Sequence, residues 1–305
     1  MAKRPIRKIA CVGEVMIELI ADASGSAQLG VAGDTYNTAV YLNRAMREHA
    51  VDVSYVTALG TDPYSARIWR AMEGHGLDMS AVERRDGAMP GLYAIDTDAT
   101  GERSFSYWRS ASAARTLFTP PCDVTLESLE RFDLVFLSGI TLAILPAGMR
   151  RAFLMWAKGF KARGGTLVYD SNHRPRLWED EASARRIAAE MWALADIALP
   201  SVDDEMLLFG DRTHADVLVR LTGLGVKKGA LKCGAAGPVN LSNGQRLSGL
   251  SGPVRVVDST AAGDSFNAGY LGAVVLGEPE DRAIRAGHEL AVKVIAAKGA
   301  ILPEN

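Results

Sequence analysis

The chain has 305 residues, and its 34 lysine and arginine residues nearly balance its 36 aspartate and glutamate residues, giving a formal net charge of −2. A nucleic-acid partner would require a basic surface, and no run of basic residues provides one, so we expect none. No stretch approaches the ~18 consecutive apolar residues of a membrane span, and the N-terminus lacks an apolar leader segment. We therefore expect a cytoplasmic globular protein with no membrane partner.

Short apolar runs alternate along the chain with helical patterns. We expect strands at 9–12, 134–137, 166–169, 197–199, 230–231 and 254–257. We expect helices at 35–47, from 63 to 74 or 76, and at 146–163, 181–194, 214–221, 263–275 and 280–297. Continuous hydrophobicity within the strands indicates burial on both faces. The pattern predicts an α/β fold, with a mostly parallel central sheet flanked by helices in a single domain over residues 1–305.

Two segments interrupt this alternation. Residues 14–20 alternate polar and apolar side chains, and Leu92–Asp96 with Ser104–Trp108 predict a hairpin around residues 98–101. Extra antiparallel strands often cover the carboxyl ends of parallel strands, where ligands bind. We expect a small β-sheet lid, inserted from about 14–33 and 88–118, although these strands could also merely cover a sheet edge. Exposed edges of such strands favour a dimer formed through the lid.

The segment Asp258–Gly269 carries the strongest chemical signal. A strand is followed by small residues and a helix start, so the backbone N–H groups of Ala262, Gly263 and Asp264 would form an anion site. A carboxylate at this position would repel a bound anion, so its presence calls for a chemical role. Accepting a proton from an attacking hydroxyl is such a role. The alternative is an ordinary acidic residue in a first helical turn.

Other segments offer binding groups. At 33–37 small residues open a helix and Asn37 could reach a polyhydroxylated ligand, although Asp34 or Thr35 could simply cap the helix. Arg109 and Arg174 could grip a carboxylate or phosphate, or form ordinary surface ion pairs.

Two further segments bear on nucleotide binding. Residues 231–237 run from a strand into a glycine-rich turn that lacks the dinucleotide fingerprint, and the chain has no P-loop motif. The carboxylates at 203–205 follow another strand and suit magnesium, although Ser201 and these acids could instead cap a helix.

Two of these segments resemble signatures of the ribokinase-like (PfkB) family of carbohydrate kinases. Residues 258–264, Asp-Ser-Thr-Ala-Ala-Gly-Asp, resemble the family's D-T-x-[GA]-A-G-D, and residues 32–37 resemble its G-G-x-x-x-N element. The correspondence runs from about Ile9 to Ala300. Within the family, the segments at 107–109 and 170–178 most resemble 2-keto-3-deoxygluconate kinases. The resemblance implies a ribokinase-like fold.

The resemblance also implies a role for each matching residue. The implied catalytic group is Asp264, the base, with the anion hole Ala261, Ala262 and Gly263. The implied substrate-binding residues are Gly33, Asn37, Tyr93 and Tyr107, with Arg109 and Arg174 for the carboxylate. The implied ATP-binding residues are Asn172, Ser201, Lys232, Gly234, Gly237 and Gly263, with Asp204 and Glu205 near the metal.

The reaction implied is transfer of phosphate from MgATP to the 6-hydroxyl of 2-keto-3-deoxygluconate (2-dehydro-3-deoxygluconate). Three positions depart from the family pattern: Ala32 and Ala261 replace glycines, and Ser201-x-x-Asp204 replaces Asn-x-x-Glu. Another family kinase of the fructokinase or ribokinase type and a catalytically silent sugar-binding homologue are alternatives. The sequence leaves open the gluconate or galactonate epimer and a monovalent-cation requirement.

Overall fold

The computed structural model describes residues 3–21, 26–97, 103–250 and 254–304. At its centre lies a six-stranded sheet in which every neighbouring pair is parallel, as predicted. Its strands, in spatial order, are β10 (Ile197–Leu199), β9 (Thr166–Asp170), β8 (Leu134–Ser138), β1 (Lys8–Val12), β4 (Asp52–Leu59) and β5 (Val82–Arg84). Every residue of β8 and β9 is buried, which is why these strands read as continuous apolar runs.

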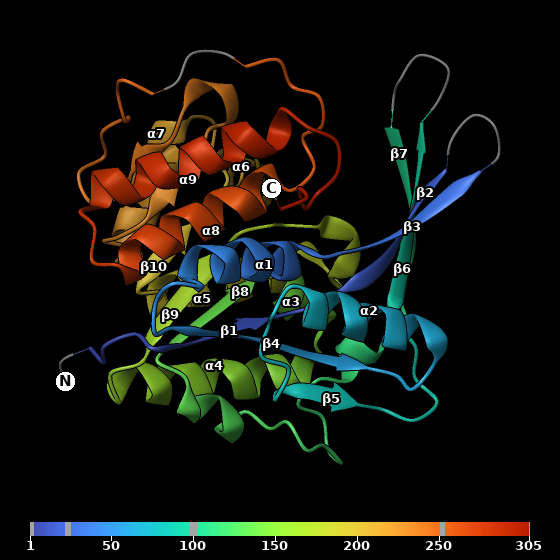
Figure 1. Cartoon of the computed structure of the whole chain (residues 1–305). Helices are drawn as coiled ribbons and strands as arrows, with labels where there is room; N and C mark the ends of the chain where they lie inside the picture. Colours follow the sequence, from blue (N-terminus) through green and yellow to red (C-terminus); the bar gives the residue numbers. More distant parts are fainter. Residues whose placement is uncertain (1–2, 22–25, 98–102, 251–253, 305) are drawn as a thin grey trace.

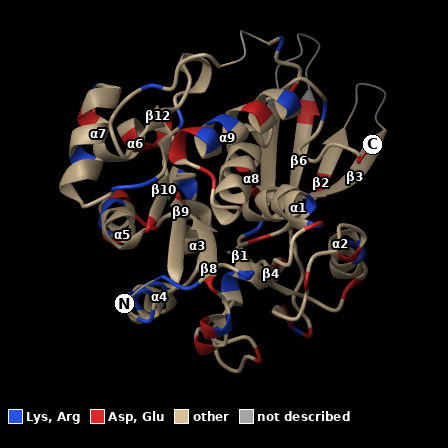
Figure 2. Cartoon of the chain, turned by 60° about the vertical axis from the view of Figure 1, so that its left-hand side comes forward, with Lys and Arg blue, Asp and Glu red and all other residues tan. Residues whose placement is uncertain are grey.

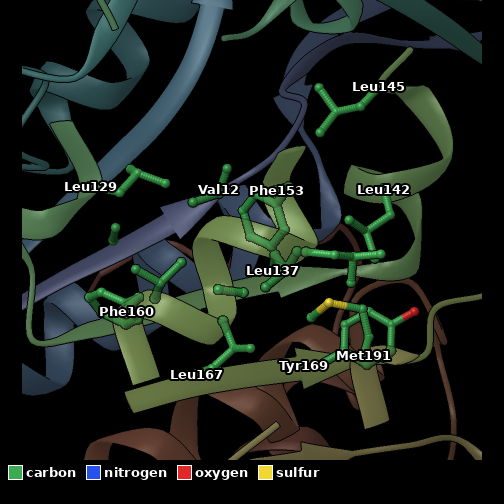
Figure 3. Packing of buried hydrophobic residues seen from close by; sticks show 14 of the residues in the cluster. Val12, Leu129, Leu137, Leu142, Leu145, Phe153, Phe160, Leu167, Tyr169 and Met191 are labelled. Atoms are coloured by element: carbon green, nitrogen blue, oxygen red, sulfur yellow. The ribbon is translucent and has the colours of Figure 1, made fainter. Parts of the chain in front are cut away.

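Helices cover both faces of this sheet (Figure 1). One hydrophobic cluster joins the sheet to α1 (Asp34–Met46), α2 (Pro63–Gly74), α8 (Ala262–Val275) and α9 (Glu280–Ile295). The other joins it to α3 (Gly139–Ile144), α4 (Ala147–Ala162), α5 (Glu181–Leu194), α6 (Val202–Phe209) and α7 (His214–Gly223). Because β1 alternates its side chains, Cys11 belongs to the first cluster and Val12 to the second. Figure 3 shows Val12 in the second cluster, with Phe153 and Phe160 of α4.

Local signals in the sequence explain where several helices begin and end. The side chain of Asp62 accepts hydrogen bonds from Tyr64 N at 2.9 Å and Ser65 N at 3.2 Å, and Pro63 opens α2. Gly164 follows α4 with a φ of 89°, the left-handed conformation that ends a helix. Both basic and acidic residues lie along α9 (Figure 2), as on a solvated helix face.

A separate small sheet stands beside the main one (Figure 1). Its order is β3 (Ala27–Ala32), β2 (Met16–Ala21), β6 (Gly91–Thr97) and β7 (Arg103–Trp108). β6 and β7 are antiparallel, which confirms the predicted hairpin, while the turn at 98–101 lies outside the described residues. β2 pairs in parallel with β6, so the small sheet is mixed.

Two strand predictions need correction. Residues 254–257 form no strand: Val256 is 57% exposed, and Val257 N bonds the carbonyl of Ile295 at the end of α9. β11 (Ala230–Leu231) forms a strand at the predicted residues but belongs to a two-stranded antiparallel sheet with β12 (Val239–Asn240). It lies beside β10 through isolated parallel bridges only, between Ala198 and Gly229 and between Ser201 and Lys232. None of the helices in the described part of the chain combines the length and apolar character needed to cross a bilayer.

Candidate active site

A cavity of about 1490 Å³ opens between the small sheet and the carboxyl ends of the parallel strands. Asp170 comes from the end of β9, Ser201 follows β10 and Lys232 follows β11, so three neighbouring strand ends contribute to its wall. The opposite wall is built by the small sheet, including Tyr93 and Tyr107. All predicted site residues line this cavity except Gly237 and Glu205.

The turn before α8 has the geometry of an anion site. Ala261 adopts a φ of 61°, a conformation unusual for a residue with a side chain, and directs the chain into the helix. The Ala262 N–H bonds the Ser259 carbonyl at 3.3 Å, and Ala262 lines the cavity; its part in an anion site stays a prediction. The N–H groups of Gly263 and Asp264 belong to the first helical turn, which has no preceding turn to bond. A Cβ at Gly263 would project to within 3.6 Å of Lys232 Nζ.

Asp264 lies in the wall of the cavity with its carboxylate held in place. Its Oδ2 accepts a hydrogen bond from Asn37 Nδ2 at 2.8 Å, and its backbone carbonyl accepts one from Thr38 Oγ1 at 3.1 Å. Burial raises the pKa of Asp264 from 3.8 to about 8, and the negative charges of Asp34 and Asp170 add to this rise. In its ionised form such a carboxylate is a stronger base than an ordinary aspartate.

A buried network places a positive charge beside this turn. Lys232 Nζ donates to Asp170 Oδ1 at 2.8 Å and to Asn267 Oδ1 at 3.1 Å, and Asn267 Nδ2 donates to Asp170 Oδ2 at 2.7 Å. Both carboxylate oxygens of Asp170 are therefore occupied, and the ammonium group is fixed in position. Asp170 and Asn267 had no assigned role in the sequence; the signal was their position, at a strand end and one turn into α8.

Asp34 is a cavity residue that the sequence suggested only as a helix cap. The N-cap of α1 is Gly33, and Asp34 Oδ2 accepts hydrogen bonds from Ser138 Oγ and from Asn172 Nδ2, the latter at 2.8 Å. Gly33 is required by close approach, since a Cβ there would lie 2.3 Å from the Glu14 carbonyl oxygen. Asn172 itself adopts a positive φ of 26°, which directs its amide toward Asp34.

The small sheet contributes aromatic rings and one arginine. Tyr93 is buried and donates from its hydroxyl to Glu18, and Tyr107 stacks on it with ring centroids 5.9 Å apart. Arg109 is also buried and forms an ion pair with Glu14, which follows β1. This pair joins the small sheet to the main sheet, and it gives Arg109 a negative partner that the sequence did not reveal.

The predicted metal-linked residues separate in the structure. Asp204 lines the cavity, where its Oδ2 accepts from Ser171 Oγ at 3.1 Å and from His173 N at 3.2 Å, and burial raises its pKa. Arg174 Nη1 lies 3.7 Å from Asp204 Oδ1.

Glu205 turns away from the cavity and accepts from Arg220 Nη2 at 2.9 Å, joining α6 to α7. Its expected place near a metal is therefore corrected. Gly237 also lies off the cavity, in the turn where its carbonyl accepts from Arg246. Ser201 lines the cavity and stands at the N-cap of α6, but its side chain makes no capping bond.

Comparison with known proteins places the chain in a class and then in a family. It matches the pfkB family of carbohydrate kinases over residues 6–305. The chain belongs to this family and is therefore a sugar kinase. The resemblance predicted from residues 32–37 and 258–264 is confirmed.

Individual relatives narrow the comparison. The chain is 42% identical over 304 residues to the 2-dehydro-3-deoxygluconokinase of Dickeya dadantii (strain 3937), with 97% of each chain covered. It is 40% identical over 304 residues to the enzyme of the same name from Escherichia coli (strain K12), with 98% of each covered. A solved structure of a putative ribokinase II in complex with ATP and Mg2+ from E. coli superposes with a TM-score of 0.82 at 21% identity, covering 97% of this chain and 95% of that one. This likeness confirms the ribokinase-like fold.

Proposed function

We propose that this sugar kinase transfers the γ-phosphate of MgATP to the 6-hydroxyl of 2-keto-3-deoxygluconate. The observation that carries the proposal is the position of Asp264, a carboxylate of raised pKa held by Asn37 beside the turn at Gly263. The 2-dehydro-3-deoxygluconokinase relatives at 40% and 42% identity support the choice of substrate.

In this mechanism Asp264 is the catalytic base. It takes the proton of the sugar's terminal hydroxyl as that oxygen attacks the γ-phosphorus, while the bond from phosphorus to the bridging oxygen of ADP breaks. The N–H groups of Gly263 and Asp264, together with the positive end of α8, stabilise the charge on the transferring group. Closure of the small sheet over bound substrates would limit the access of water and favour transfer to sugar over hydrolysis.

The sugar acid would lie between the small sheet and α1. Gly33 and Asn37 face its hydroxyl groups, and Tyr93 with Tyr107 provides an aromatic wall. Arg109 and Arg174 were expected to hold the carboxylate, and both line the cavity. Charge-assisted bonds of this kind are stronger than neutral ones, so they favour an acid over a neutral hexose.

The nucleotide would lie along the strand ends. Asn172, Ser201, Lys232 and Gly234 line that part of the wall, and the neighbour solved with ATP and Mg2+ supports this assignment. No group of three His, Cys, Asp or Glu side chains arranged to hold a metal occurs among the described residues. Mg2+ nevertheless fits, because it is usually held by one or two carboxylates, water and substrate phosphates, and Asp204 is a carboxylate in the wall. When bound, the metal would neutralise phosphate charge.

A dimer formed through the small sheet is a further part of the proposal. β7 is an edge strand of the small sheet, and Trp108 at its end is 61% exposed. Exposed apolar edges favour pairing with another copy. Light scattering should give twice the chain mass, and Trp108→Lys should give a monomer; a monomeric wild type would contradict the dimer.

An ADP-release assay over a panel of sugars tests the function. We expect rapid MgATP turnover with 2-keto-3-deoxygluconate or its galactonate epimer and at least tenfold lower kcat/KM with fructose or ribose. Phosphorus–proton coupling in the product's NMR spectrum should place the phosphate on the terminal CH2 group. Higher kcat/KM with a neutral sugar would overturn the substrate, and the absence of turnover with every sugar would indicate a silent homologue.

A further inference from the structure

The cavity contains more positive charge than the sequence assigned to it. Among the described residues, the basic side chains in its wall are Lys232, Arg109, Arg115, Arg174 and Arg176. Three of them have an acidic partner within the protein. Lys232 is paired with Asp170, Arg109 with Glu14, and Arg174 lies 3.7 Å from Asp204. An anion that approaches any of these three also meets the neighbouring carboxylate.

Arg115 and Arg176 are different. Neither forms a hydrogen bond or an ion pair through its side chain with any residue in the described part of the chain. Neither guanidinium is therefore directly neutralised by a carboxylate of the described residues. This difference could not be read from the sequence, because it depends on which carboxylates the fold brings near each arginine.

The two unpaired arginines are held differently by the fold. Arg176 is exposed in a short 3-10 helix, Pro175–Leu177. Arg115 is half-buried in another, Ala113–Thr116, which follows β7 and contains the buried residues Ala113 and Ala114.

Contacts on both sides fix the backbone at Arg115. Ala113 N bonds the Met89 carbonyl at 2.8 Å, and Arg115 N bonds the Ser112 carbonyl at 3.1 Å. Ala114 packs in a cluster with Ile140 of α3. The position of Arg115 is thus set by the core, while its side chain reaches the cavity that Arg109 also lines.

We propose that Arg115 is a specificity-determining residue that binds the carboxylate of the sugar acid, and this inference rests on the proposed function. Arg115 supplies the uncompensated charge that attracts the carboxylate. Arg109, whose guanidinium is oriented by Glu14, supplies a further donor but little net charge, because the Arg109–Glu14 pair is formally neutral. Recognition of the acid over a neutral sugar therefore depends more on Arg115 than on Arg109.

The test compares Arg115→Gln with Arg176→Gln, the matched change at the other unpaired arginine of the same cavity. We would measure kcat and KM for the sugar acid, for the analogue in which a primary alcohol replaces the carboxylate, and for ATP. A charge-assisted bond is typically worth about 1.5–3 kcal/mol, so Arg115→Gln should raise KM for the acid about 10- to 150-fold. Its kcat, its KM for ATP and its KM for the alcohol should change by less than about threefold, and its rise in KM for the acid should exceed that of Arg176→Gln. Arg115→Lys keeps the charge and should recover part of the loss.

Each other outcome is decisive. An unchanged KM for the acid, an equal rise for the alcohol, or a rise confined to ATP would overturn the role of Arg115 while leaving the proposed function standing. If the wild-type enzyme phosphorylates no sugar acid, the function and the inference fail together. Thermal melting of each variant checks folding. If Arg115→Gln does not fold, Arg115→Met is measured in its place, because it also removes the charge; an unchanged KM for the acid would then overturn the role of Arg115.

Discussion

Replacing Asp264 with asparagine should make the ligand-free protein more stable, and increasingly so as pH rises. The introduced amide would be neutral at every pH and similar in shape to the protonated aspartate, and its side-chain oxygen can still accept the hydrogen bond from Asn37. The wild-type carboxylate must instead ionise in a buried wall near Asp34 and Asp170. The substitution therefore removes an unfavourable charge without removing a contact.

The size and sign of the effect follow from the pKa. The folded protein holds the proton of Asp264 up to about pH 8, whereas the unfolded chain releases it near 3.8. Stability from this group is thus fully present below pH 3.8 and is lost as pH rises toward 8. One pKa unit corresponds to about 1.4 kcal/mol, which would allow about 6 kcal/mol in total. Because the side chain is partly exposed to the water of the cavity, we expect the gain to be about 2 kcal/mol at pH 8.

Urea denaturation of the wild type and of Asp264→Asn at pH 5.5, 7 and 8.5 measures this difference in the free energy of unfolding. The gap between the two proteins should widen with pH. The matched control is Asp86→Asn, at an exposed turn position that does not line the cavity, for which the gap should stay within about 0.5 kcal/mol. A constant gap for Asp264→Asn across this range would refute the claim that the folded protein disfavours the carboxylate.

Three further predictions concern the same site. The kcat/KM of the wild type should rise with pH through the acidic limb of its profile, with a midpoint well above 3.8, because Asp264 must be ionised to act as base; a flat profile down to pH 5 would contradict this. Ala261→Gly should retain activity and change the free energy of unfolding by less than about 1 kcal/mol, since relief of the strained φ of 61° is offset by backbone entropy. Ala261→Val should lower the free energy of unfolding by about 2 kcal/mol, as followed by thermal melting. Equal melting temperatures of the two variants would argue against strain. Gly33→Ala should cost about 2–4 kcal/mol, because the new Cβ would lie 2.3 Å from the Glu14 carbonyl oxygen, and wild-type melting would show that this approach is not tight.

Much of the fold could be predicted because its signals are local. Asp62 followed by Pro63 marks the start of α2, and Gly164 marks the end of α4, without reference to any distant residue. The strand predicted for the valine-rich run at 254–257 was wrong. A strand forms only beside a second strand that pairs with it, and the hydrophobicity of a segment does not show whether such a partner is present. β4 was missed for a related reason: its mixture of polar and apolar residues conceals a strand buried almost throughout.

The candidate site also has one part that local sequence predicts and another that depends on residues far apart in the chain. The turn at 261–264 was predictable because small residues before a helix start have a direct electrostatic consequence. Partnerships across the chain were not: Glu14 and Arg109 are 95 residues apart, and only the fold brings them together. Asp204 and Glu205 are adjacent in sequence but face the cavity and Arg220 respectively, because neighbouring side chains on a helix point in different directions.

The most direct test of the account is phosphoryl transfer by Asp264→Asn measured alongside its binding of the sugar acid. General-base catalysis typically contributes about 10²- to 10⁴-fold, so kcat should fall by at least about 100-fold, while calorimetric affinity for 2-keto-3-deoxygluconate stays within about threefold of wild type. Turnover near the wild-type rate would show that another group takes the proton, and the central assignment would be wrong.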